Sequence, residues 1–155
     1  MSKSIQRHFT ATGIVIDEKQ RVLLIFHRKL GVWLPPGGHV EPNETPDKAC
    51  LREIREETGI TAVIISNGEF SQVNDEYAHV LPTPYSVLLE DIYRQGVHFH
   101  IDFLYRCCPI AGVFPTYNER ETKDVGWFPA DALPEPMYHN AREVILQALR
   151  DKKNH

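Results

Sequence analysis

The chain of 155 residues is 42% hydrophobic and 25% charged, with a formal net charge of −4 at pH 7. This length and composition are typical of one soluble globular domain, so we expect residues 1–155 to form a single domain with a buried core. The acidic balance and the lack of any long Lys/Arg run argue against a binder of duplex nucleic acid. The sequence has neither an apolar signal core nor an apolar stretch of the ~18 residues that a membrane span needs. We therefore expect a cytoplasmic protein with no membrane partner.

Hydrophobic patterning along the chain predicts strands mixed with two helices. Five consecutive apolar residues, Val22 to Phe26, indicate a strand that is buried on both faces. Four prolines and glycines in succession, Pro35 to Gly38, predict irregular backbone over residues 29–44. The predicted strands are 8–17, 21–28, one or two strands within 60–73, then 84–93, 97–108 and a short strand and turn at 124–133. The predicted helices are Pro46–Thr58 and an amphipathic helix at 138–151. This order has no regular strand–helix alternation, so it favours an α+β fold with helices packed on a mixed sheet.

The first predicted helix has recognisable ends. Thr45 is a suitable N-cap, Pro46 suits the first helical position, and Gly59 is placed to stop the helix. At about 100° per residue, Cys50 and Ile54 can face the core on one side of this helix. The helix is thus expected to be anchored by one stripe while the opposite stripe is free for another role.

Three glutamates occupy that opposite stripe. Glu53, Glu56 and Glu57 fall within an arc of roughly 100°. A solvated acidic face tempered by neighbouring arginines is the simple interpretation. However, the cluster lies near the negative end of the helix dipole, follows a glycine-rich loop and has Glu44 just upstream. Carboxylates gathered against local preference indicate a cation, and oxygen-only ligands suit Mg²⁺ or Mn²⁺, which also hold substrate phosphates.

The spacing of these residues carries a resemblance to a known family. From Gly38 the chain runs five residues to Glu44 and seven more to the segment Arg52–Ile60, which reads REIREETGI. This pattern resembles the complete signature of the Nudix hydrolases. The flanking segments at 33–38 (WLPPGG) and 125–128 (VGWF) are also similar to Nudix segments.

The resemblance implies an α/β/α sandwich around a mixed, partly barrel-like sheet, with the signature forming a loop–helix–loop metal site. It implies that Glu56 and Glu57 are the main ligands of a divalent cation. It also implies that Glu53 is a further ligand or the general base, and that the Gly37 carbonyl completes the shell.

The resemblance further assigns residues that support the site. Glu44 would act through Arg52, whose guanidinium can hold a carboxylate with two hydrogen bonds. The glycine pair lets backbone approach an ion closely. An alternative for Arg52 is a simple surface ion pair with Glu56. The residues expected to support the site are Gly38, Glu44 and Gly59.

The activity implied by the resemblance is hydrolysis of a phosphoanhydride in a nucleoside diphosphate linked to another group. Many relatives take a base or an extra ligand from a loop outside the signature. Here Glu119 and Glu121 are available, and Glu121 is favoured because it lies six residues before Trp127. The expected catalytic residues are Arg52, Glu53 and Glu121, although a solvated acidic loop is the alternative for Glu121.

A later strand alternates between polar and apolar residues. His98, His100 and Asp102 should share one face, which could line the substrate cleft, bind a transition metal or simply be solvated. His39 and Tyr77 are further candidates for substrate contacts. The loop at 74–85 is long enough to form a cleft wall or lid.

The substrate stays open among nucleoside triphosphates, nucleotide sugars, ADP-ribose-like compounds and dinucleoside polyphosphates. Two other classes compete: a nucleotide-binding domain without activity, and an isoprenoid-diphosphate isomerase. The isomerase needs a cysteine in its cleft, and Cys50 lies on the core side of the helix. Because many Nudix proteins are dimers, a homodimer is an alternative to a monomer.

Overall fold

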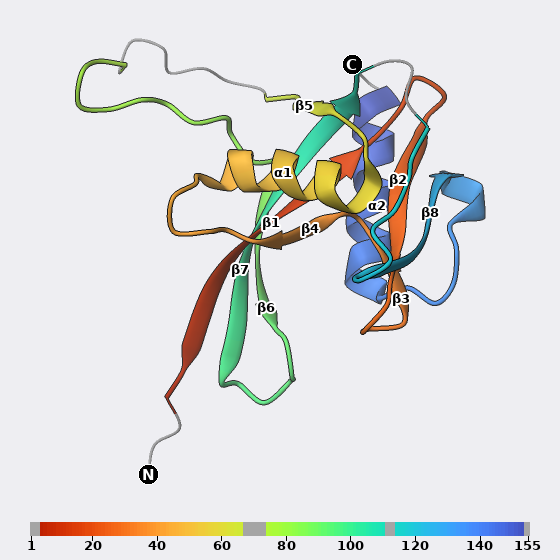
Figure 1. The fold of residues 1–155 in the computed structure, drawn as a ribbon, viewed down its shortest axis with the longest axis horizontal. Coiled ribbons are helices and arrows are strands. Elements are labelled where there is room, and N and C mark those ends of the chain that lie inside the picture. Colours follow the sequence, from red (N-terminus) through yellow and green to blue (C-terminus); the bar gives the residue numbers. More distant parts are fainter. Residues whose placement is uncertain (1–3, 67–73, 111–113, 154–155) are drawn as a thin grey trace.

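The computed structural model describes residues 4–66, 74–110 and 114–153. Two helices lie on opposite sides of a layer of strands (Figure 1). The strands are β1 Gln6–Val15, β2 Arg21–His27, β3 Val32–Leu34, β4 Gly37–His39, β5 Ala62–Ile64, β6 Ser86–Asp91, β7 His98–Pro109 and β8 Thr122–Pro129. The helices are α1 Pro46–Thr58 and α2 His139–Lys153, and a single 3₁₀ turn, Ala130–Ala132, follows β8.

The strands form two sheets. The larger has the order β4-β1-β7-β5, with β6 also paired to β7, and the smaller has the order β3-β2-β8. β1 and β7 run parallel, whereas every other pairing described is antiparallel. The larger sheet is therefore mixed, and the predicted α+β class is confirmed. Within the residues that the structure describes, the strands do not close into a barrel.

Strand β2 lies between two hydrophobic cores. Leu23 packs in the core beneath α1, together with Ile54 of that helix. Leu24 points the other way and packs against Ile145 of α2. These four side chains are all fully buried. The unbroken apolar run was thus correctly interpreted as a strand buried on both faces.

Irregular backbone was predicted for residues 29–44, and this prediction is wrong in two places. Val32–Leu34 forms β3, and the glycine pair opens β4, which pairs with β1 in the register Ala11 opposite Gly38. The reason is steric. A Cβ on Gly37 would approach the Ala11 carbonyl oxygen to 2.6 Å, so glycine allows this edge strand to lie close against β1.

The segment 60–73 was expected to contain a strand pair or one long bent strand. Within the described residues 60–66, Ala62–Ile64 forms a strand, β5, whereas residues 67–73 lie outside the described part of the chain. The strand expected within 124–133 begins earlier, at Thr122, because its pairing with β2 extends back to His27.

Helix α1 has the predicted bounds. Pro46 occupies the first turn, and Gly59 follows the helix with a φ of 69°, donating its N–H to the Arg55 carbonyl. Thr45 has the extended backbone of an N-cap, but its side chain makes no capping hydrogen bond. Among the described residues, no helix is both long and apolar enough to cross a membrane.

Candidate metal and diphosphate site

The glutamates of α1 are not a uniformly solvated face. The Glu57 residue is only 3% exposed, and the Glu53 side chain is 12% exposed. By contrast, the Glu56 side chain is 57% exposed. Helix geometry places the three on one side, and packing against β4 buries two of them. A buried carboxylate needs a compensating partner, so this arrangement calls for cationic or hydrogen-bonding groups nearby.

Arg52 supplies one such group. Its Nε and Nη2 donate to the two carboxylate oxygens of Glu44 at 3.0 and 2.7 Å. Its Nη1 donates to Glu53 at 2.8 Å and to Glu56 at 3.1 Å, and Nη2 also donates to the His39 carbonyl at 3.1 Å. The surface pair with Glu56 is therefore present, but as one part of a network that orients three carboxylates.

The glycines of β4 fit closely around the other two carboxylates. The Gly37 N–H donates to Glu57 Oε1 at 2.9 Å. A Cβ added to Gly38 would overlap the Glu53 carboxylate. Only a residue without a side chain leaves room for Glu53 at this point, which gives the glycine pair a steric role at the site.

The protonation of these groups reflects their burial. Desolvation, followed by the charges of Glu53 and Glu121, raises the pKa of Glu57 to about 8, against the lowering effect of the Gly37 hydrogen bond. Desolvation also raises the pKa of Glu53, whereas the hydrogen bond and the positive charge of Arg52 act to lower it. The hydrogen bonds from Arg52 lower the pKa of Glu44. The ionised forms of Glu53 and Glu57 are thus disfavoured in the absence of a counter-charge, and a bound cation would favour them.

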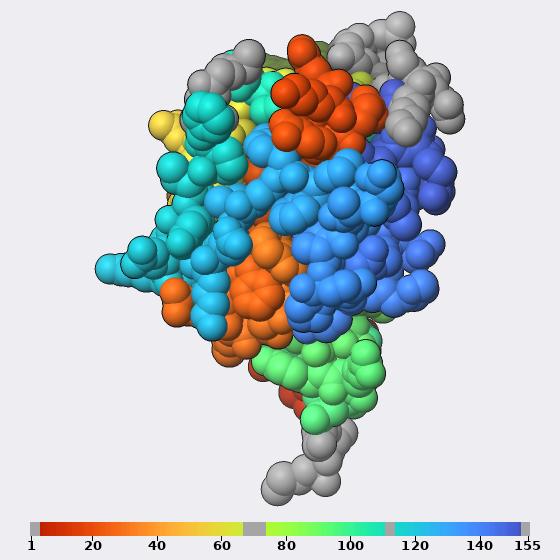
Figure 2. All heavy atoms as spheres, turned by 90° about the vertical axis from the view of Figure 1, so that its right-hand side faces the viewer, coloured from red at the N-terminus to blue at the C-terminus, as the bar shows by residue number. Residues whose placement is uncertain are grey.

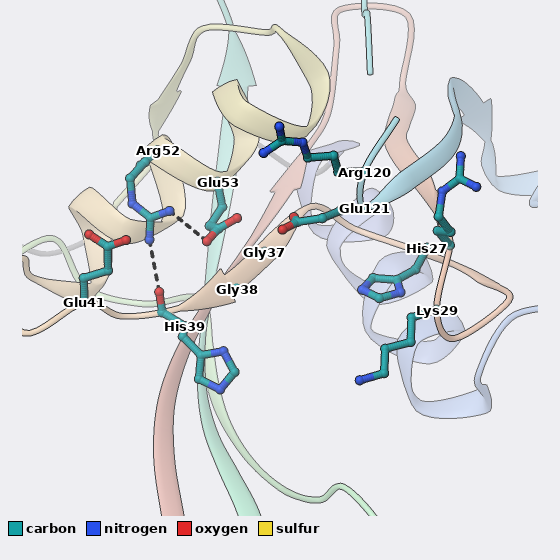
Figure 3. A pocket seen from close by; sticks show the side chains of 11 residues that line it. His27, Lys29, Gly37, Gly38, His39, Glu41, Arg52, Glu53, Arg120 and Glu121 are labelled. Carbon is teal, nitrogen blue, oxygen red and sulfur yellow. Dashed lines mark hydrogen bonds and ion pairs between the residues drawn. The ribbon is translucent and has the colours of Figure 1, made fainter. Parts of the chain in front are cut away.

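A cavity of about 470 Å³ opens beside these carboxylates. Glu53 and Glu121 point toward each other across it, and Lys29 lies on the same side of it as Glu121 (Figure 3). The lining residues are His27, Arg28, Lys29, Gly37, Gly38, His39, Glu41, Arg52, Glu53, Arg120 and Glu121. The wall opposite Glu53 therefore carries the cations Lys29 and Arg120 together with Glu121, an arrangement that suits a divalent ion together with phosphate groups.

The structure places some predicted residues at this cavity and others away from it. Glu121 lines the cavity, whereas Glu119 is exposed beside it. His39 also lines it, but Tyr77 is 89% exposed, and no described residue of the loop at 74–85 is among the lining residues. A cleft wall or lid role for that loop is thus not supported by the described residues.

Sequence reasoning did not single out the cationic wall. Arg28 and Lys29 follow β2, and Arg120 directly precedes Glu121. The β2 end and the Glu121 loop are joined by a hydrogen bond from the Arg28 N–H to the Glu121 carbonyl at 2.8 Å. A basic pair placed between a buried strand and the glycine-rich loop is the signal that could have identified this wall.

The polar face of β7 forms as predicted, but Asp102 and the two histidines contact different neighbours. Asp102 accepts hydrogen bonds from the hydroxyls of Thr10 at 2.9 Å and Thr12 at 3.0 Å, and it is buried. His98 and His100 instead lie beside His8 of β1. His100 is not among the residues that line the cavity.

Comparison with known proteins agrees with this site. The model of the NUDIX domain matches residues 6–148. The chain belongs to the NUDIX domain family. A MutT-like protein from Streptomyces ambofaciens is 30% identical over 140 residues, which cover 90% of this chain and 75% of the relative. The prediction of a Nudix pyrophosphohydrolase is thereby confirmed at the level of enzyme class.

Two further similarities extend the comparison. The crystal structure of a NUDIX-family hydrolase from Clostridium perfringens is 28% identical, with a TM-score of 0.81, and covers 96% of this chain and 99% of its own. The mouse protein named 8-oxo-dGDP phosphatase NUDT18 is 26% identical over 142 residues, which cover 88% of this chain. This Nudix chain spans only 36% of that relative's length.

Proposed function

We propose that this protein is a Mg²⁺- or Mn²⁺-dependent hydrolase that cleaves the phosphoanhydride of a nucleoside diphosphate linked to a further group. The observation that carries the proposal is the pairing of two unlike walls in one cavity. Glu53 of α1 lines the same cavity of about 470 Å³ as Glu121, and Arg28, Lys29 and Arg120 line it too. Cationic side chains can bind phosphate oxygens while the carboxylates hold the cation.

The residues present fit a hard divalent cation. The donor set is made of oxygen atoms, and Glu57 is buried beside two other acids, which raise its pKa. Glu53, Glu56, Glu57 and the Gly37 carbonyl would hold the ion. Magnesium, when bound, supplies charge neutralisation at the diphosphate and activation of a water nucleophile. Nudix hydrolases in general use a divalent metal, which is consistent with this donor set.

The remaining steps belong to side chains of the chain itself. Arg52 holds Glu53 in place with a hydrogen bond of 2.8 Å, and Glu121 faces Glu53 across the cavity. Either carboxylate could accept a proton from the attacking water, and burial favours Glu53 because it raises the pKa of that group. Arg28, Lys29 and Arg120 would neutralise the charge that develops on the leaving phosphate.

For the substrate, we place oxidised purine nucleoside di- and triphosphates first. A relative that covers most of this chain bears the name 8-oxo-dGDP phosphatase. Tyr77, which was a candidate for substrate contacts, is 89% exposed and does not line the cavity. We further propose that the protein acts in the cytoplasm on small nucleotides. Dimerisation stays a prediction.

The proposal is tested by incubating the protein with Mg²⁺ or Mn²⁺ and a substrate panel. The panel contains normal and 8-oxo-purine nucleotides, dinucleoside polyphosphates, nucleotide sugars and ADP-ribose, with products identified by mass spectrometry. We expect release of phosphate, pyrophosphate or a nucleoside monophosphate from one class. Metal-dependent binding without products would instead support a nucleotide-binding domain, and turnover of an isoprenoid diphosphate would support the isomerase.

Glu53→Gln and Glu57→Gln should each lower kcat by about 10²-fold or more on the best substrate, because each removes a charge needed at the metal and water. Glu143→Gln, on the exposed side of α2, is the matched control and should retain full activity. Circular dichroism and thermal unfolding should show that both site variants remain folded. Full activity in both would contradict the assignment.

A further inference from the structure

Three histidines from two distant parts of the chain meet on one face of the larger sheet. β1 and β7 pair in parallel with Gln6 opposite His98 and His8 opposite His100. Because residues two apart in a strand share a face, His98 and His100 lie on the same face as His8. This part of the sheet, at the N-terminal ends of β1 and β7, leads away from both helices (Figure 1). The neighbouring tip of the β6–β7 hairpin projects from the body of the molecule (Figure 2).

The three imidazoles are arranged around a common point. One nitrogen from each of His8, His98 and His100 can be chosen so that all three lie within 4.8 Å of one another. The ring centroids of His8 and His98 are 4.8 Å apart, and those of His98 and His100 are 5.4 Å apart. His39 joins from β4, with its ring 5.0 Å from that of His100 and 5.5 Å from that of His8.

One buried nitrogen of the cluster has no partner: within the described residues, the Nδ1 of His8 makes no hydrogen bond. The neighbouring acids are Glu90, which lies opposite His100 in β6, and Asp102, which accepts hydrogen bonds from two threonine hydroxyls. Glu90 and Asp102 are also hydrogen-bonded to each other. An unpartnered ring nitrogen facing other imidazoles is a costly arrangement unless a further group completes it.

The state of the rings also suits ligation. Desolvation and the neighbouring histidines lower the pKa of His100 to about 4. Neutral imidazole is the form that binds a metal.

We infer that His8, His98 and His100 form a binding site for a borderline transition-metal cation such as Zn²⁺, with His39 or water in the fourth position. Imidazole ligands at about 2.0–2.1 Å in a tetrahedral site stand about 3.4 Å apart, so modest side-chain rotation closes the set. Nitrogen ligands select Zn²⁺, Co²⁺, Ni²⁺ or Cu²⁺ over Mg²⁺.

The set of His8, His98 and His100 is distinct from the carboxylate site and approaches it only through His39, which lines the carboxylate cavity. The inference does not depend on the proposed function. The imidazole of His39 lies on the other side of β4 from Glu53, although the His39 carbonyl accepts a hydrogen bond from Arg52 (Figure 3). The two sites also differ in the ligands that the protein supplies, which are oxygen atoms in one and imidazole nitrogens in the other. They can therefore be loaded independently.

The test is a Zn²⁺ titration of the full chain against a chromophoric chelator, with Mg²⁺ in excess to occupy the carboxylate site. We expect one equivalent of tightly bound Zn²⁺. Replacing Zn²⁺ by Co²⁺ should give the visible absorption of a tetrahedral site. His8→Gln and His100→Gln should each weaken Zn²⁺ binding at least about tenfold, because each removes a ligand.

Two controls distinguish this site from other sources of binding. His79→Gln alters a histidine of the loop at 74–85 and should leave Zn²⁺ affinity unchanged. Glu57→Gln removes a carboxylate of the Nudix site and should also leave it unchanged. Equal Zn²⁺ affinity in wild type, His8→Gln and His100→Gln, or a loss of affinity in Glu57→Gln instead, would overturn the proposal. Circular dichroism on each variant confirms that the fold is retained.

Discussion

Arg52 organises more of the Nudix site than any single carboxylate does. One guanidinium donates to Glu44, Glu53 and Glu56 and to the backbone carbonyl of His39. Its planar array of N–H groups makes this possible, since each acceptor lies along a different donor direction. The cluster of acids would otherwise repel, and the fixed orientation of Glu53 depends on this one residue.

Arg52→Lys should therefore lower kcat about 10- to 100-fold and weaken apparent Mg²⁺ affinity, although the charge is kept. A lysine ammonium cannot bind Glu44 with two parallel hydrogen bonds and reach Glu53 at once. The measurement is kcat as a function of Mg²⁺ concentration on the best substrate. Arg55→Lys, an exposed arginine one turn along α1, is the matched control and should behave like wild type. Identical Mg²⁺ curves for the two variants would contradict an organising role for Arg52.

At the scale of elements, α1 is held against β1 by an unusually close contact. A Cβ added to Gly13 would lie 2.5 Å from Ile54 Cδ1, 2.9 Å from Ile54 Cγ1 and 3.1 Å from Cys50 Sγ. Gly13 thus lets the helix approach the sheet closely enough to hold Glu53 and Glu57 beside β4. Sequence patterning predicts the two elements but not the distance between them.

Gly13→Ala should destabilise the fold by about 1–3 kcal/mol, because the added methyl group overpacks this contact. Urea unfolding measures this loss directly. The double variant Gly13→Ala/Ile54→Val removes the methyl group that clashes and should recover part of the loss relative to the sum of the single variants. Strict additivity of the two changes would show that the contact is not the cause.

At the scale of the whole molecule, the end of α2 is tied to two distant parts of the chain. Tyr85, which directly precedes β6, donates its hydroxyl hydrogen to Asp151 Oδ2 at 2.5 Å. Lys152 Nζ donates to the carbonyls of Ile16 and Asp17 at 3.2 and 2.5 Å. These bonds fix the last helix over the core that contains Ile145.

Burial and the bond to Asp151 raise the pKa of Tyr85 to about 12, above its ordinary value of 10.0. The stabilisation from the neutral hydroxyl is therefore complete below about pH 10, where both states keep the proton, and is lost as the pH rises toward 12. Tyr85→Phe should lower the unfolding temperature at pH 8. The difference from wild type should shrink between pH 10 and 12.

Tyr138→Phe, at a tyrosine that is 43% exposed, is the control for tyrosine ionisation in general. The difference in unfolding temperature between Tyr138→Phe and wild type should not shrink between pH 10 and 12. A Tyr85→Phe difference that stays constant across the same pH range would contradict the role assigned to this hydrogen bond.

Local pattern determined the features that depend on residues close together in the chain. The bounds of α1 and the shared stripe of Glu53, Glu56 and Glu57 follow from helical periodicity and end signals over a few turns. The two-sided burial of β2 follows from its apolar run in the same way. The family could be recognised because its signature lies within one continuous segment, Gly38 to Ile60.

Tertiary structure alone decided which distant residues share a site. Arg28 and Lys29 line the same cavity as Glu53 because the end of β2 is hydrogen-bonded to the chain at Glu121. His8 meets His98 and His100 only through the parallel pairing of β1 with β7, across about ninety residues. The alternation of residues within one strand does not identify the strand with which it pairs, because the same alternation is compatible with more than one partner. The acidic residues of the Nudix site could therefore be predicted from the sequence, whereas its cationic residues and the histidine cluster depend on how the strands pair.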